Sequence, residues 1–333
     1  MENTKINVNL NPESKHHLSP VLVLAYNRPD LLESLLNSLP LDRRIYIHVD
    51  GAINTDEHDV QETRRVASQF KAIGPAESVR LLFQASNLGN LGSFKSAVEW
   101  VFSSEDRLIL LEDDIRFTNS LFLFMDWALE KYKNSNRIFQ INGLSIINTL
   151  PGRNRLFESY TCRPWGFGTW KTSWELYKST ESLEDPEDIF SLPIFAGVNL
   201  TDTFKSKWLD RFTRLKNGTD TYDLGWNYAA WTNNRFALAP RFTFTTNVGF
   251  DSRALHTRVK PMFLRFGKKP KIRKSNFYDK NVVPFPSYYD AYSDFLEWGV
   301  PGINKGSVRF FIQIYKLAKE VRRLLVTLYS FGK

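Results

Sequence analysis

The stretch PVLVLAYNRPDLLESLL, residues 20–36, sets the fold class of this chain. Its first seven residues, 20–26, are almost all apolar and rich in valine and leucine, which favours a buried β-strand. Residues 27–30 include Asn, Asp and Pro, which are typical of a turn. Leucines then recur at helical spacing over residues 31–39. The stretch therefore predicts a strand, a turn and a helix in that order.

The same order repeats along the next hundred residues. Apolar runs that predict strands occupy residues 44–49, 79–84 and 108–111, and patterns that predict helices occupy 56–70, 93–102 and 120–131. Such alternation predicts an α/β fold with a mostly parallel, doubly wound sheet. Ligands of these sheets bind beyond the carboxyl ends of the strands. Arg28, Asp50 and the acidic triplet Glu112-Asp113-Asp114 all follow strand ends, so we expect them to lie along one edge.

The pattern changes after residue 135. An apolar run at 138–141, an aromatic and glycine-rich stretch at 165–174 and an extended run at 236–250 replace the regular alternation. We therefore divide a domain of residues 19–257 into a first half, 19–135, and a second half, 136–257. A polar segment, 1–18, precedes this domain, and a basic extension, 258–333, follows it.

The extension carries most of the positive charge. From Arg258 onward there are 16 basic and 5 acidic residues, whereas the whole chain has a net charge of only +8. Residues 308–329 have apolar side chains every three or four positions and basic ones between them, which predicts a basic amphipathic helix. Such a helix can lie on an anionic membrane surface, or it can dock on the enzyme or in an oligomer interface.

Bulk composition narrows the class of protein. With 333 residues and 42% hydrophobic side chains, the chain can bury a sizeable core. It shows no apolar signal segment and no run of eighteen apolar residues. The single cysteine, Cys162, excludes an internal disulfide framework. We therefore expect a cytoplasmic protein, peripheral on the inner face of the plasma membrane if its basic helix binds lipid, and no nucleic-acid partner.

The acidic triplet is the strongest chemical signal. Three carboxylates at the end of a buried strand repel one another, so they need a cation or hydrogen-bond donors beside them. Mn²⁺ or Mg²⁺ is one such partner, and it is commonly held by one or two carboxylates together with substrate phosphates. The alternative is that Glu112, Asp113 and Asp114 only end a strand and cap the next turn.

Several segments, taken in order, resemble a known family. They are PVLVLAYNRPDLLESLL, HVDG, SFKSAVEWVF, LILLEDDI, RPWGFGTWKTSWELY, YDLGW and NVGFDSRALHT. Together they resemble the inverting GT-A glycosyltransferases, in particular N-acetylglucosaminyltransferase I and its bacterial family 2-like relatives. The resemblance covers roughly residues 19 to 257 and implies a glycosyltransferase domain with a donor half, 19–135, and an acceptor half, 136–257.

The resemblance implies roles in donor binding. Asp114 would bind the metal that bridges the donor diphosphate, Asp113 would lie near the ribose, and Glu112 would support both. Arg28 would contact the donor nucleotide, and Asp50 would contact the uracil of a UDP-sugar. Taken only as residues, Arg28 is equally suited to a solvated turn, and Asp50 to a turn before glycine.

It also implies a catalytic base. The family has an acid in an aromatic-flanked stretch, and Tyr222 to Trp226 keeps one acid of that pattern, Asp223, with Asp220 as its competitor. His256 aligns with a histidine that approaches the metal or the diphosphate, although a lone histidine is more often an ordinary hydrogen-bonded residue.

The aromatic stretch at 165–174 has two interpretations. Trp165, Trp170 and Trp174 are candidates for a sugar pocket, because sugars stack on aromatic faces, and core packing is the alternative for most of them.

The predicted function is the transfer of a hexose or N-acetylhexosamine from a nucleotide sugar to a saccharide or glycolipid. The resemblance places this reaction in bacterial surface polysaccharide or lipopolysaccharide assembly. A sugar-nucleotide nucleotidyltransferase and a non-catalytic saccharide-binding protein are the alternatives. A nucleotidyltransferase should have a glycine-rich phosphate loop after its first strand, and residues 25–29 do not form such a loop. A retaining mechanism would use much of the same donor site.

Overall fold

The computed structural model describes residues 18–53, 55–74, 78–146, 156–250, 253, 282–286, 288–298 and 302. The polar segment up to residue 17, His256 and the amphipathic helix predicted at 308–329 lie outside these described residues. Their predicted roles, and the domain boundaries, stay predictions.

The first half alternates strands and helices as the sequence predicts. Its elements are β1 (Val21–Ala25), α1 (Pro29–Leu36), β2 (Ile45–Val49), α2 (Glu57–Ile73), β3 (Val79–Phe83), α3 (Gly89–Phe102), β4 (Arg107–Glu112), β5 (Ile115–Phe117) and α4 (Ser120–Lys131). Pro29 begins α1, where the missing N–H of proline has no helical acceptor to lose. The short strand β5 was not predicted.

A nine-stranded sheet runs through the molecule in the order β11-β7-β9-β6-β8-β4-β1-β2-β3. Of its eight neighbouring pairs, five are parallel, including β1 with both β2 and β4. The chain moves outward from β1 to β2 and β3, and then returns to form β4 on the other side of β1. The order of the strands therefore reverses between β1 and β4. Ligands of such folds bind at this switch point, beyond the carboxyl ends of the two strands.

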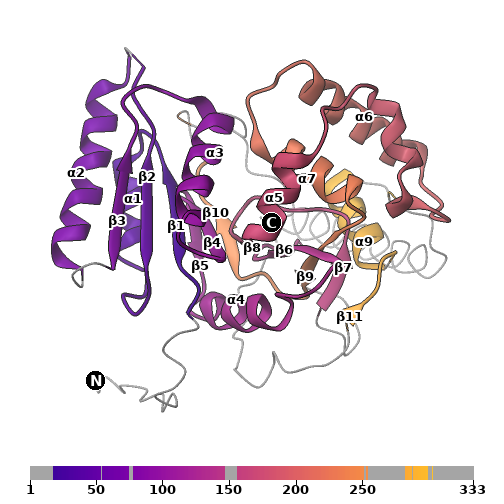
Figure 1. The fold of residues 1–333 in the computed structure, drawn as a ribbon, viewed down its shortest axis with the longest axis horizontal. Coiled ribbons are helices and arrows are strands. Elements are labelled where there is room, and N and C mark those ends of the chain that lie inside the picture. Colours follow the sequence, from indigo (N-terminus) through magenta and orange to yellow (C-terminus); the bar gives the residue numbers. More distant parts are fainter. Residues whose placement is uncertain are drawn as a thin grey trace, which may run out of the picture.

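Helices cover both faces of this sheet (Figure 1). On β1, Val21 and Val23 join the hydrophobic core made with α1, α2 and α4, whereas Leu22 joins the core made with α3 and the later helices. Side chains alternate in this way because successive residues of a strand point to opposite faces. The predicted doubly wound α/β fold, with a mostly parallel sheet flanked by helices, is confirmed.

The second half is more irregular. Its elements up to residue 250 are β6 (Ile138–Asn142), β7 (Leu156–Ser159), β8 (Phe167–Trp170), α5 (Lys171–Ser179), η2 (Pro186–Ser191), η3 (Pro193–Phe195), α6 (Asp202–Lys216), α7 (Tyr222–Thr232), β9 (Phe236–Pro240) and β10 (Thr245–Asn247). Strand β8 runs antiparallel to both of its neighbours, β4 and β6, and β7 runs antiparallel to β9. The extended run 236–250 divides into β9 in the main sheet and β10, which pairs with β5 in a separate two-stranded sheet.

Part of the basic extension belongs to this fold. The strand β11 (Val282–Val283) pairs with β7 at the edge of the sheet, and the helix α9 (Tyr288–Trp298) also contacts β7. Figure 1 shows α9 beside the second half of the sheet. Its side chains Asp290 and Asp294 are buried. Within the described part of the chain, no helix has both the length and the apolar character needed to cross a membrane.

Candidate active site

The strand ends meet where the topology predicts. In the register of β1 with β4, Leu24 lies opposite Glu112, so the loop that begins at Tyr26 lies beside the acidic triplet. The N–H of Asp113 donates a hydrogen bond of 3.0 Å to the carbonyl of Leu24. Arg28 follows β1 directly, and the fold therefore places its side chain within reach of all three acids.

Arg28 forms the centre of an ion cluster with two of these acids. Its guanidinium donates hydrogen bonds to both carboxylate oxygens of Asp113, and its Nη1 lies 3.1 Å from Asp114 Oδ2. The side chain of Asp113 is 2% exposed and that of Arg28 is 16% exposed. Burial disfavours the charged guanidinium, but Asp113 and Asp114 outweigh it and raise the pKa of Arg28 above its ordinary value. Arg28 is thus an ion-pairing residue and not a solvated turn residue.

The cluster holds protons more tightly than ordinary carboxyl groups. Burial, with the neighbouring charge of Asp114, raises the pKa of Glu112 to about 8. Burial also raises the pKa of Asp113 to about 7, although Arg28 acts against this rise. Tyr222 donates a hydrogen bond of 2.9 Å to Glu112 Oε1. Three acids with one guanidinium leave an excess of negative charge that favours either protonation or a second cation.

Asp114 is the acid best suited to bind that cation. Its Oδ1 is buried and has no hydrogen-bond partner among the described residues. A carboxylate oxygen is the hard ligand that Mg²⁺ or Mn²⁺ prefers. No group of three or more His, Cys, Asp and Glu side chains in the described segments is arranged to hold a metal. The residues therefore fit a metal held by one carboxylate with ligand phosphates, and not a cage made of protein alone.

Asp50 lies at the same edge but faces the protein. It follows β2 and is 4% exposed, and its Oδ1 accepts hydrogen bonds from the N–H groups of Gly51 and Leu88. These bonds tie the end of β2 to the start of α3. Its contact with a nucleotide base stays a prediction.

Asp223 lies at the start of α7, in the second half of the fold. It lies in the first turn of α7, is partly exposed and accepts a hydrogen bond from the hydroxyl of Thr221. Two hydrogen bonds of Tyr222 hold this end of the helix against the donor half. The preceding residue, Tyr222, bonds to Glu112, and the N–H of Tyr222 donates to Asn90 Oδ1 at 3.3 Å.

Asp220, the competing candidate base, has a different environment. Its two carboxylate oxygens accept hydrogen bonds of 2.8 Å from the N–H groups of Asn90 and Leu91, in the first turn of α3. Gly89, at the start of that turn, has a φ of +73°, and a Cβ there would lie 2.5 Å from Asp220 Oδ2. Asp220 therefore caps α3 and holds the loop before α7 against it. A carboxylate bonded in this way is poorly placed to take a proton from a substrate.

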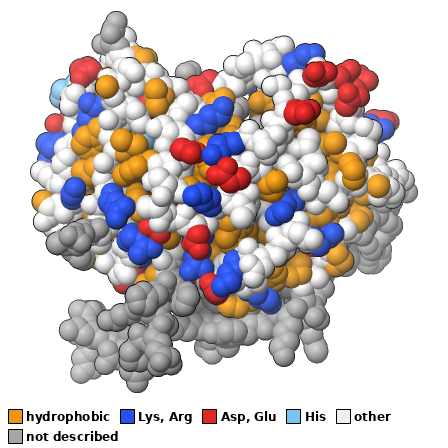
Figure 2. All heavy atoms as spheres, in the orientation of Figure 1, with side chains coloured by type: hydrophobic (Ala, Val, Ile, Leu, Met, Phe, Trp, Pro, Cys, Tyr) orange, Lys and Arg blue, Asp and Glu red, His pale blue; other side chains and the backbone are white. Residues whose placement is uncertain are grey.

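These residues surround one cavity of about 470 Å³. Of the predicted site residues, Arg28, Glu112, Asp114 and Asp223 line it. Asp113 and Asp50 are not in its lining. Figure 2 shows basic and acidic side chains interspersed over the face that it draws, rather than one large field of a single sign.

The tryptophans separate into two groups. Trp165 lines the cavity, whereas Trp170 and Trp174 are buried in the two hydrophobic cores. The indole N–H of Trp170 donates to the carbonyl of Leu129, and that of Trp174 to Glu99. Packing therefore accounts for two of the three.

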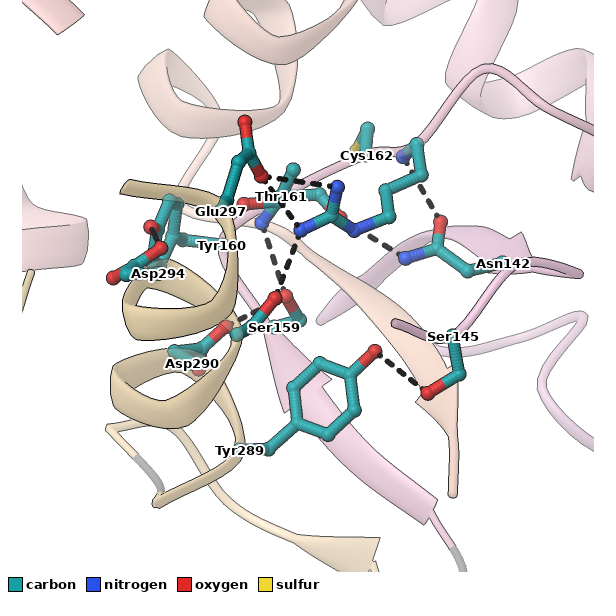
Figure 3. A network of polar contacts seen from close by, with 12 residues as sticks. Asn142, Ser145, Ser159, Tyr160, Thr161, Cys162, Tyr289, Asp290, Asp294 and Glu297 are labelled. Carbon is teal, nitrogen blue, oxygen red and sulfur yellow. Dashed lines mark hydrogen bonds and ion pairs between the residues drawn. The ribbon is translucent and has the colours of Figure 1, made fainter. Parts of the chain in front are cut away.

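Sequence reasoning missed the basic and acidic residues that the second half contributes. Arg163 follows β7, Arg211 and Arg214 lie on α6, and Glu297 lies on α9, and all four line the cavity. Figure 3 shows Glu297, Asp294 and Asp290 projecting from α9 toward residues 159–162. The spacing of Arg211 and Arg214 places them on one side of a helix, but only the packing of α6 decides what that side faces.

Comparisons with known proteins add little. Neither the family models nor the curated protein sequences gave a match. Among solved structures, one similar chain is a UDP-glucose pyrophosphorylase in complex with UDP-glucose. It is 8% identical, the alignment covers 67% of this chain and 91% of that one, and the TM-score is 0.29. A likeness at this level carries no argument about function.

Proposed function

We propose that this chain is a metal-dependent, inverting glycosyltransferase that moves a hexose or N-acetylhexosamine from a nucleotide sugar, a UDP-sugar in the first instance, to a saccharide or glycolipid. One observation carries the proposal. A single cavity is lined by Arg28, Glu112 and Asp114 from the donor half and by Asp223 from the acceptor half. Cation-binding groups and a carboxylate that faces the same space are what such a transfer needs.

The chemistry assigns a task to each side of the cavity. Asp223 takes the proton of the acceptor hydroxyl while that oxygen attacks the anomeric carbon of the donor sugar. The bond from the anomeric carbon to the diphosphate oxygen breaks, and its electron pair leaves with the nucleoside diphosphate. Attack from the face opposite to the leaving group inverts the anomeric configuration.

The donor half binds the diphosphate. Arg28 would donate hydrogen bonds to phosphate oxygens, because a guanidinium is a planar donor that matches them. Asp114 would hold Mn²⁺ or Mg²⁺, whose chemistry in such a reaction is to neutralise charge on the departing diphosphate. Its partnerless Oδ1 supports this assignment.

The first experiment is a thermal-shift screen of nucleotide sugars with and without Mn²⁺. A ligand that binds the folded state selectively raises the melting temperature by mass action. We expect a UDP-sugar to raise it more with Mn²⁺ than without, and Asp114→Asn to remove that difference. Asp114→Asn with an unchanged metal effect would remove the metal assignment.

The second experiment is turnover of the donor that this screen identifies. We expect Asp223→Asn to lower turnover about 100-fold or more while keeping the thermal shift by the donor. Proton NMR of the product gives its anomeric configuration, and retention would contradict the inverting mechanism. Release of pyrophosphate from UTP and a sugar 1-phosphate would instead establish the nucleotidyltransferase.

A further inference from the structure

The wall of the cavity on the acceptor side is rich in arginine. We call Arg163, Arg211 and Arg214 the arginine cluster. Glu297 Oε1 accepts a hydrogen bond of 2.7 Å from Arg211, and Glu297 Oε2 accepts bonds of 3.2 and 3.3 Å from Arg163. Arg214 lies one turn beyond Arg211 on α6. Two guanidinium groups therefore share one carboxylate at this wall.

Glu297 is an acid that bonds to two arginines of this cluster. Although burial favours the neutral form of Glu297, Arg163 and Arg211 lower its pKa, so it carries one negative charge. The ion pair of Arg214 with Asp210 is 3.5 Å long and both side chains are more than half exposed, so it contributes little. Three arginines thus line this wall, and the carboxylate of Glu297 lies between two of them.

Two further acids of α9, Asp290 and Asp294, are buried beside this wall. Neither Asp290 nor Asp294 is in the lining of the cavity. Asp294 accepts a hydrogen bond from Tyr160, and burial raises its pKa well above the ordinary value. Asp290 accepts a hydrogen bond from Ser159, and Figure 3 shows this bond on the same side of α9 as the bonds of Glu297.

Burial limits the contact of these arginines with water. The side chain of Arg163 is 10% exposed, and a charge withdrawn from water to this degree needs close partners of opposite sign. Arg211 lies with its guanidinium carbon 4.7 Å from the centre of the Trp208 ring, which also lines the cavity. The indole N–H of Trp208 has no acceptor among the described residues. Three guanidinium groups and an indole N–H without an acceptor in the described segments therefore lie together on this wall.

The helix α7 connects this wall to the proposed base. Asn227 exchanges two hydrogen bonds with the backbone of Cys162, the residue before Arg163. The same helix carries Asp223 and, through Tyr222, is bonded to Glu112. Asp223 thus belongs to a helix that is bonded both to the acidic triplet and to the residue before Arg163. A saccharide held by the cluster would meet the base from the acceptor side.

We propose that the arginine cluster binds an anionic group of the acceptor, a carboxylate or a phosphate, so that the acceptor is an acidic saccharide. This inference rests on the proposed function, because it takes the diphosphate of the donor to be bound by Arg28 on the other side. Guanidinium groups bind both anions through paired N–H donors, which neutral sugars cannot use as well.

The test compares three sugars of similar size at constant ionic strength. D-glucuronate carries a carboxylate, glucose 1-phosphate carries a phosphate, and D-glucose is neutral. We expect at least one of the two acids to bind about 10-fold more tightly than glucose in a titration followed by NMR. The tighter acid identifies whether the anion is a uronic acid or a sugar phosphate.

Variants on α6 locate the binding. Arg214→Gln should weaken the acid about 10-fold and leave glucose unchanged, and Arg211→Gln should do the same. Lys216→Gln removes an exposed charge of the same helix that does not line the cavity, so it should change neither Kd.

Three results would overturn the proposal. The first is that the two acids bind no more tightly than glucose. The second is that Lys216→Gln weakens the acids as much as Arg214→Gln does. The third is that only Arg28→Gln, and neither variant on α6, removes acid binding. Failure of the transferase function is seen separately, as absence of a thermal shift by any nucleotide sugar.

Discussion

The phenolic hydroxyl of Tyr222 lies 2.9 Å from Glu112 Oε1 and donates a hydrogen bond to it across 110 residues of sequence. Glu112 ends the central strand β4, and Tyr222 begins the helix that carries the proposed base. The ring of Tyr222 stacks on Phe94 of α3 at a centroid distance of 4.2 Å. The bond therefore fixes the distance between the two sides of the cavity.

Tyr222→Phe should destabilise the protein by about 1–2 kcal/mol, because the ring packing remains while a buried carboxyl group loses its donor. Urea denaturation measures this difference. The donor should still bind, since the metal and diphosphate contacts do not involve the hydroxyl. An unchanged denaturation midpoint would show that the hydrogen bond contributes nothing.

The metal-free protein should become less stable as pH rises from about 4 to about 8. The pKa values of Glu112 and Asp113 are raised to about 8 and about 7, so the folded state holds protons that the unfolded chain releases in this interval. The free energy of unfolding therefore falls with increasing pH. Urea denaturation in EDTA at pH 5 and pH 8 measures the change.

Glu112→Gln should reduce this dependence, because glutamine is neutral at every pH and keeps the size of the side chain. Glu33 is exposed, and Glu33→Gln should leave the dependence as it is. Equal pH dependence in the wild type and Glu112→Gln would contradict the raised pKa of Glu112.

Asp220→Ala should behave as the loss of a helix cap and not as the loss of a base. It removes both bonds to the N–H groups that begin α3, which costs about 1 kcal/mol of stability. Turnover should fall far less than in Asp223→Asn, since Tyr222 still holds α7 in place. If Asp220→Ala loses as much turnover as Asp223→Asn at equal folded fraction, the roles of the two acids must be exchanged.

Gly249→Ala should weaken metal-dependent donor binding. A Cβ at Gly249 would lie 2.2 Å from Asp114 Oδ2 and 2.8 Å from Arg28 Nη1, so both side chains must move. We expect the extra thermal shift that Mn²⁺ gives with the donor to be lost. Gly225→Ala is the matched control, since its Cβ meets no atom closer than 3.5 Å and alanine favours a helix by about 0.5–1 kcal/mol. Loss of the metal effect in both variants would contradict this explanation.

The sequence determined the first half of the fold to within a few residues. The predicted strand at residues 20–26 contains β1, and the predicted helix at 120–131 is α4. Buried parallel strands are nearly continuous apolar runs, and the helices between them have a clear period, so local pattern and tertiary structure agree. Because parallel strands end at one edge, the same reasoning predicted that Arg28 and the acidic triplet would meet.

The second half could not be predicted in this way. Strands β7 and β8 have four residues each and gain their partners only from distant parts of the chain, so no local period marks them. The basic composition after residue 258 concealed β11 and α9, which pack on the sheet. Composition reports average charge, whereas the packing of an element depends on which few side chains face the core.

The sequence alone therefore determined that the sheet is mostly parallel and that Arg28 and the acidic triplet follow the ends of its strands. Only the tertiary structure decided that Asp220 caps α3, that Asp223 lines the cavity and that three arginines line the same cavity as Glu112 and Asp114. The physical reason is the range of the interactions. Strand and helix periods are set by neighbouring residues, whereas the hydrogen bonds of Asp220 and Tyr222 join residues more than one hundred positions apart.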